Sequence, residues 1–255
     1  MLAISLPNGV DGASRAFLRP LTGADELGLH GDSYRDAVLL VERLIVDEDE
    51  CLQPGQTRRL PVGDFDAIIA TLFCDLYGER AEARCECARC RKAYEFDVPV
   101  AAVNADRRQA DERIFVRDGV RVARLAEGTM LRLPEVRDLL SVAVSPLSLE
   151  TFIVERGGDA PDIVENALAL FCPLLADTVA TTCPNCGGGQ SVEFDLTTFF
   201  MKSLLRERDV LLREIDVVAR AYGWSFADIV AMPRALRHGF VRIAGAATAR
   251  RARAA

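Results

Sequence analysis

Short runs in which hydrophobic and polar residues alternate recur along the chain, a pattern typical of β-hairpins. The first pair of runs, Leu2–Leu6 and Ser14–Arg19, flanks Pro7-Asn8-Gly9, and an Asn-Gly pair favours a tight turn. Two later hairpins are indicated by similar closing segments, Tyr94–Val98 and Val192–Leu196. The alternation therefore predicts several small antiparallel hairpins.

Other segments carry apolar residues at intervals of three and four, the spacing of one face of an α-helix. This spacing predicts helices over 33–46 and 60–76, and a long helix over 197–222. Thr22 is the expected N-cap of a short earlier helix, and Asp64 the expected N-cap of the helix over 60–76. A short helix to Met232 and a final helix from Pro233 complete the C-terminal part.

The stretch between the second and third hairpins is predicted to be an inserted unit. After a polar linker at 104–112, alternation predicts a hairpin over 114–125 with its turn at Asp118-Gly119, and a strand over 129–133. Three helices are expected to follow, at about 134–144, 147–156 and 160–176.

Two Cys-x-x-Cys pairs, Cys87/Cys90 and Cys183/Cys186, lie at the predicted tips of the second and third hairpins. Each pair supplies two thiolates, and a structural zinc ion takes four ligands in a tetrahedron. We therefore interpret the pairs as one shared structural zinc site. Ordinary zinc ribbons place roughly 12 to 20 residues between their pairs. Here residues 91–182 intervene, enough for a separate subdomain.

Three other states of these cysteines stay open, namely loss of the metal, disulfide formation and free thiols. Disulfides are disfavoured because no feature of the sequence marks the chain for export. Cys85 precedes Cys87 by two residues on the same predicted strand, where it can substitute as a ligand or lie beside the site. Cys74 and Cys172 fall among apolar helix residues and are interpreted as core positions.

Composition limits the classes of function. Half of the 255 residues are apolar, which is ample for a core. A net charge of −7 and a pI near 5.1 argue against a general binder of nucleic acid or of anionic membranes. The sequence shows no apolar run approaching the ~18 residues of a membrane span and no basic signal-peptide start. These features predict a cytoplasmic protein.

Catalytic chemistry is not indicated. The two histidines, His30 and His238, lie apart from other catalytic residue types, and the common phosphate-binding and nucleophile motifs are absent. A catalytic zinc ion needs three protein ligands and an open position, and no general base is evident near the cysteines. We expect neither an enzyme nor a small-molecule substrate.

The predicted fold class is α+β, with helices packed around β-hairpins, a composite zinc-ribbon-like four-cysteine site and a C-terminal helical unit. The expected parts are an N-terminal hairpin, helices and first knuckle (1–100), an inserted subdomain (101–177), the second knuckle (178–196) and the C-terminal unit (197–255). Tyr222 and Trp224, at a helix junction, form an aromatic anchor of the kind that dominates protein interfaces. The alternative is that Trp224 only joins the two helices.

Several segments, taken in order, resemble one family of phage proteins. They are Leu6–Gly9, Leu18–Glu26, Leu60–Asp64, Leu76–Arg80 with the first Cys-x-x-Cys, Cys183–Gly187, Phe194-Asp195, Phe199-Phe200, Leu212–Ser225 and Ile229–Pro233. Their succession is similar to the T-even-type phage baseplate hub assembly chaperone family of contractile phages and phage-derived contractile injection systems. The chain departs from it at Asp216, where many members have His, at the additional Cys85, and in the acidic loop 47–50.

The resemblance implies that the protein assists assembly of the baseplate or hub of a contractile tail. Its partners would be hub, baseplate or spike proteins. A second hypothesis is a zinc-ribbon module that acts on nucleic acid or the transcription machinery. The cysteine knuckles favour this second hypothesis, and the acidic charge disfavours it.

Overall fold

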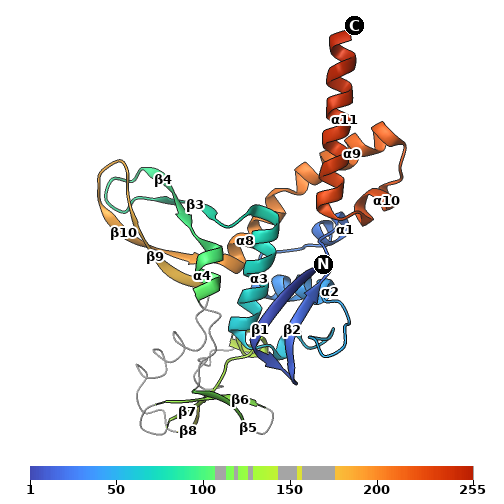
Figure 1. The fold of residues 1–255 in the computed structure, drawn as a ribbon. Helices are drawn as coiled ribbons and strands as arrows, with labels where there is room; N and C mark the ends of the chain where they lie inside the picture. The colour runs from blue at the N-terminus through green and yellow to red at the C-terminus, as the bar shows by residue number, and fades with distance from the viewer. Residues whose placement is uncertain (107–112, 118–119, 126–128, 143–153, 157–175, 255) are drawn as a thin grey trace.

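The computed structural model describes residues 1–106, 113–117, 120–125, 129–142, 154–156 and 176–254. Over these residues, helices are combined with small antiparallel sheets (Figure 1), which confirms the α+β prediction. Three sheets have two strands. The fourth has four, in the order β5 (Ile114–Arg117), β6 (Val120–Arg124), β7 (Met130–Arg132) and β8 (Val154–Arg156). None of the helices in these ranges combines the length and apolar character that crossing a lipid bilayer requires.

The first hairpin pairs β1 (Leu2–Val10) with β2 (Ala13–Leu18). The turn predicted at Pro7-Asn8-Gly9 is wrong, because these residues lie within β1 and the chain turns at Asp11-Gly12, where both φ angles are positive. The pairing register shifts between Ser5 and Val10, so the predicted turn residues form an irregular stretch of strand.

A side chain from a distant helix explains this irregular stretch. Asp64, in the first turn of α3 (Val62–Tyr77), accepts hydrogen bonds from the backbone N–H groups of Gly9 at 2.5 Å and Asn8 at 3.4 Å. Gly9 has a φ of +61°, and a Cβ there would lie 2.1 Å from the carbonyl oxygen of Ala13. The prediction that Asp64 caps α3 is wrong, since Pro61 holds the N-cap position.

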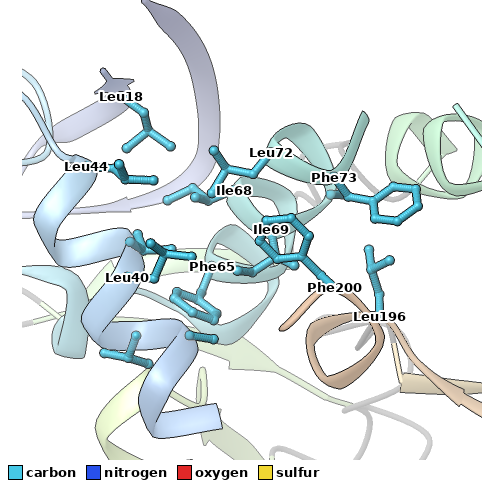
Figure 2. Packing of buried hydrophobic residues seen from close by; sticks show 14 of the residues in the cluster. Leu18, Leu40, Leu44, Phe65, Ile68, Ile69, Leu72, Phe73, Leu196 and Phe200 are labelled. Carbon is cyan, nitrogen blue, oxygen red and sulfur yellow. The ribbon is translucent and has the colours of Figure 1, made fainter. Parts of the chain in front are cut away.

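The helices predicted near the N-terminus are confirmed. Thr22 caps α1 (Gly23–Leu27), and Ser33 caps α2 (Tyr34–Leu44) in a capping box with Asp36. A short 3-10 turn, η1 (Thr57–Arg59), precedes α3. The apolar faces of α2 and α3 pack together with β2 and the first turns of α8 (Leu196–Arg206) in one core. Figure 2 shows part of it, including Leu18, Leu40, Leu44, Phe65, Ile68, Ile69, Leu72, Phe73, Leu196 and Phe200.

The two cysteine hairpins form as predicted. One pairs β3 (Ala81–Glu86) with β4 (Ala93–Val98), and the other pairs β9 (Ala176–Thr182) with β10 (Gly189–Asp195). Both are regular antiparallel ladders, and their tips lie side by side (Figure 1).

The insert contains α4, α5 and the four-stranded sheet. Their bounds are α4 (Val100–Asp106), β5 (Ile114–Arg117), β6 (Val120–Arg124), β7 (Met130–Arg132), α5 (Val136–Val142) and β8 (Val154–Arg156). The predicted hairpin and following strand are confirmed, although its turn at 118–119 lies outside the described residues. Residues 104–106 are helical and not part of a linker, because α4 extends through them and packs against α3.

The helices expected over 147–156 and 160–176 lie mostly outside the described residues. Where they overlap the structure, the prediction is wrong. Residues 154–156 form β8, which pairs with β7, and residue 176 begins β9. In both places pairing with another strand overrides the helical pattern of the local sequence.

The long helix predicted over 197–222 is interrupted. It consists of α8 (Leu196–Arg206) and α9 (Arg208–Tyr222), separated by Glu207. The Glu207 carboxylate accepts a hydrogen bond from Tyr77 Oη at 2.9 Å and pairs with Arg234. These contacts link the break between the two helices to α3 and to α11 (Arg234–Ala254).

After α9, Gly223 ends the helix in the left-handed conformation, and Ser225 caps α10 (Phe226–Ala231). The last helix is α11 (Arg234–Ala254), whose end projects from the rest of the described chain (Figure 1). Helices α9 to α11 share a small core. It contains Leu211, Ile215, Val218 and Ile229.

A buried ion cluster, which the sequence did not indicate, joins these helices to α1. The Arg237 side chain is almost fully buried and pairs with Glu26 at 2.7 Å and with Glu214 at 2.9 Å. Arg234 also pairs with Glu26, at 3.3 Å. A buried arginine requires such partners because its desolvation is costly.

We predict that Asp64→Ala lowers the free energy of unfolding by about 2 kcal/mol, because it leaves buried N–H groups of β1 without acceptors. Asp75→Ala, at an exposed position of the same helix, is the matched control and should change stability by less than roughly 0.5 kcal/mol. Urea unfolding followed by circular dichroism measures both. Equal stability of the two variants would contradict the proposed role of Asp64.

Candidate metal centre

The first cysteine knuckle is held by two backbone hydrogen bonds at the tip of its hairpin. The N–H of Cys87 donates to the carbonyl of Lys92 at 3.0 Å, and the N–H of Arg91 donates to the carbonyl of Cys87 at 2.9 Å. Arg91 has a φ of 60°, a left-handed conformation that is unusual for a residue with a Cβ. The resulting turn brings Cys90 back beside Cys87.

The second knuckle repeats this geometry. Cys183 donates to the carbonyl of Gly188 at 2.9 Å, and the N–H of Gly187 donates to the carbonyl of Cys183 at 2.9 Å. Gly187, with a φ of 67°, occupies the position equivalent to Arg91. The two tips are therefore built in the same way, although only the second carries the glycine that this conformation favours.

The four cysteine sulfurs predicted to form one site lie together. The Sγ atoms of Cys87 and Cys186 are 3.7 Å apart, as are those of Cys90 and Cys183, and all four lie within 4.8 Å of one another. A Zn–S distance of about 2.3 Å implies about 3.8 Å between sulfurs in a tetrahedron. Disulfide sulfurs are ~2.0 Å apart, so these cysteines are free. The arrangement fits a four-coordinate metal ion.

Burial around the sulfurs is uneven. Cys87 and Cys183 are 1 % and 0 % exposed, whereas Cys90 and Cys186 are half-buried. Tyr94 packs against the group from β4. One side of the site is thus closed by protein, and the other is close to the surface.

The surroundings lower the pKa of two of these cysteines and raise the pKa of a third. The pKa of Cys87 is lowered, chiefly by the N–H of Cys90. Burial acts to raise the pKa of Cys183, but N–H groups of its own knuckle and the other cysteine sulfurs lower it to about 6. The N–H of Lys92 acts to lower the pKa of Cys90, but burial and the neighbouring sulfurs raise it to about 11. A bound cation stabilises all four thiolates together.

A glutamine that the sequence did not indicate connects the two hairpins beside the sulfurs. The side-chain amide of Gln190, on β10, donates to the carbonyl of Glu86 at 3.1 Å and accepts from the N–H of Ala88 at 2.7 Å. It also lies 3.6 Å from Cys85 Sγ. Cys85 is outside the group of converging sulfurs. No local pattern could identify Gln190, since its partners lie on the other side of the insert.

Tyr222 and Trp224, the predicted partner-binding residues, lie at the end of α9, where their rings contact Phe240 of α11. Their rings stack with centroids 4.9 Å apart, and Trp224 meets Phe240 edge-on at 4.8 Å. Trp224 is nevertheless 36 % exposed. These contacts join the helices and still leave aromatic surface accessible, so the partner-binding role stays a prediction.

The histidines take no part in the cysteine group. His30 is exposed, and His238 Nε2 lies 3.1 Å from Glu214 Oε1. Within the described ranges, the four cysteines are the one cluster of three or more His, Cys, Asp or Glu side chains whose ligand atoms converge in this way.

We predict that the purified chain binds one metal ion, and that Cys183→Ser releases this ion and lowers the melting temperature. The hydroxyl is a poorer ligand for a soft metal site, and the two hairpins lose their shared ion. Cys85→Ser is the control, because Cys85 lies beside the site but outside the four sulfurs. Elemental analysis and thermal unfolding measure the effects. Unchanged metal content and melting of Cys183→Ser would refute the site.

Comparisons of the chain with protein-family models, with curated proteins and with solved structures find no significant match. The similarity to the baseplate hub assembly chaperone family therefore stays a prediction from the sequence segments that carry it.

Proposed function

We propose that the chain is an assembly factor, or a minor component, of the baseplate or hub of a contractile phage tail or of a phage-derived contractile injection system. The observation that carries this role is the ordered succession of similar segments over nearly the whole sequence. We further propose that the four cysteines hold a structural zinc ion and that the protein acts in the cytoplasm, without enzymatic activity.

The chemistry of the donor set supports a structural metal. Four thiolates complete a tetrahedral zinc ion and leave no open position for a substrate. Thiolate ligands also disfavour magnesium and calcium, which prefer oxygen, whereas zinc and iron accept four sulfurs. Zinc is the metal usual in ribbon-type structural sites.

The metal would act as a clamp. The hairpins β3–β4 and β9–β10 flank the insert, so one shared ion closes the loop of chain between them. Thiolate coordination couples metal binding to folding with apparent energies of ~10 kcal/mol or more in small zinc modules. Because Asp195, the last residue of β10, is the N-cap of α8, the clamp also fixes where the C-terminal helices begin.

The C-terminal helices offer the surface that we propose for the tail partner. Most of the exposed large apolar side chains among the described residues lie there. They are Val210, Leu212, Val217, Trp224, Phe226, Leu236 and Ile243. Contiguous exposed apolar patches mark interaction sites, and we propose that these side chains supply one. Tyr222 and Trp224 lie within this segment and supply a rigid aromatic anchor.

We predict that the chain co-purifies with a hub, baseplate or spike protein co-expressed from the same genome, and that Phe226→Ser weakens this association about tenfold or more. Phe226 is 57 % exposed, so its replacement should leave the melting temperature unchanged. Leu39→Ser, on α2, replaces another exposed apolar residue and is the control. Failure of every tail protein to co-purify would contradict the assembly role.

One local feature favours the zinc-ribbon alternative. The tip of the first knuckle exposes Arg89, Arg91 and Lys92, a small cationic group of the kind that contacts phosphates. Arg91 is already paired with Glu86 at 2.8 Å, and the chain as a whole carries a net charge of −7. Repulsion between this acidic chain and the phosphates of a nucleic acid outweighs the attraction by three local cations.

We therefore predict no binding of duplex DNA or single-stranded RNA at micromolar protein and about 0.15 M salt, measured by fluorescence anisotropy. Binding that Lys92→Glu abolishes, with metal content unchanged, would instead support the nucleic-acid module.

A further inference from the structure

A groove of about 810 Å³ lies between the two cysteine hairpins and α8. Its apolar lining includes three aromatic rings, Phe96 from β4, Phe194 from β10 and Phe199 from α8. Phe194 and Phe199 contact each other with ring centroids 5.3 Å apart. Since the hairpins meet through their sulfurs at the tips, the groove follows the strands away from the metal centre.

The groove runs along strand edges. Three consecutive residues of β3, 82–84, and four consecutive residues of β10, 192–195, line it. Side chains alternate between the two faces of a strand, so a groove on one face would be lined by every second residue. The consecutive lining residues therefore indicate that the groove borders the edges of these strands. Within the described residues, β3 pairs only with β4, and β10 only with β9. Each strand therefore keeps one edge with unpaired N–H and C=O groups.

The amide of Gln190 shows what the outer edge of β3 can bind. It donates to the carbonyl of Glu86 and accepts from the N–H of Ala88, the residues on either side of Cys87. One residue of a neighbouring parallel strand makes the same two bonds, through its own N–H and C=O groups. At its tip, the β3 edge already pairs with an amide as it would with another strand. The same edge continues into the groove at Arg84 and Glu82.

We propose that the groove binds an extended peptide segment of a partner protein, which pairs its backbone with the outer edge of β3. Alternate side chains of that segment would pack on the three phenylalanines. The proposal does not depend on the phage-tail function proposed above.

Charge supports a peptide over a nucleic acid. The acidic residues Glu82, Glu193 and Asp195 line the groove together with the basic residues Arg84, Lys202 and Arg206. A polyanion would be repelled by the three acidic groups, whereas a peptide with residues of both signs can match the lining.

The test uses the metal-loaded full chain and a displayed library of short random peptides. We expect selected peptides with alternating apolar residues, and Val192→Arg should lower their affinity about tenfold or more by filling the groove. Val116→Arg, at an exposed position on β5, is the matched control. Methylation of alternate backbone nitrogens in a selected peptide should also abolish binding, because it removes the pairing N–H groups without altering the protein.

Three results would overturn the proposal. The first is a library without a binder above background. The second is affinity that survives both Val192→Arg and backbone methylation. The third is binding of a synthetic peptide of residues 157–175 in place of library peptides, which would assign the groove to a segment of this chain. Failure of tail proteins to co-purify, with library peptides still bound, would count against the tail function alone.

Discussion

The convergence of four cysteine sulfurs at the tips of two hairpins is the constraint on which the rest of the structure depends. The hairpins come from opposite ends of the insert, and neither tip has a large apolar core. Beside the sulfurs, the side-chain amide of Gln190 adds hydrogen bonds between them. A metal ion bound by all four thiolates would supply the energy that so small a contact area lacks.

A second constraint acts at the other end of α8. The start of α8 follows directly on β10 of the second cysteine hairpin, whereas Glu207 fixes the end of α8 through Tyr77 and Arg234. The buried Arg237 then fastens α11 to α1 and α9. The orientation of the C-terminal helices is therefore set by charged contacts and, as we propose, by a metal. Their exposed apolar side chains are then left available for a partner.

Features set by local chemistry could be predicted from the sequence, and features set by distant contacts could not. The knuckles could be predicted because Cys-x-x-Cys between alternating segments defines a turn by itself. The prediction of a turn at Asn8-Gly9 was wrong because Asp64, from α3, accepts hydrogen bonds from the N–H groups of these two residues within a strand. Likewise the break at Glu207 depends on Tyr77 and Arg234, which no window of local sequence includes.

The candidate site follows the same division. Its four cysteines could be predicted from residue type and spacing, and so could their meeting across the insert, because each knuckle supplies only two of the four ligands of a tetrahedral ion. The hydrogen bonds of Gln190 beside them could not be predicted, because they join residues on opposite sides of the insert. X-ray absorption at the metal edge of the purified full chain tests the central claim most directly. The account predicts one zinc ion per chain, surrounded by four sulfurs at about 2.3 Å. A protein without metal, or an ion with nitrogen or oxygen ligands in place of these sulfurs, would contradict it.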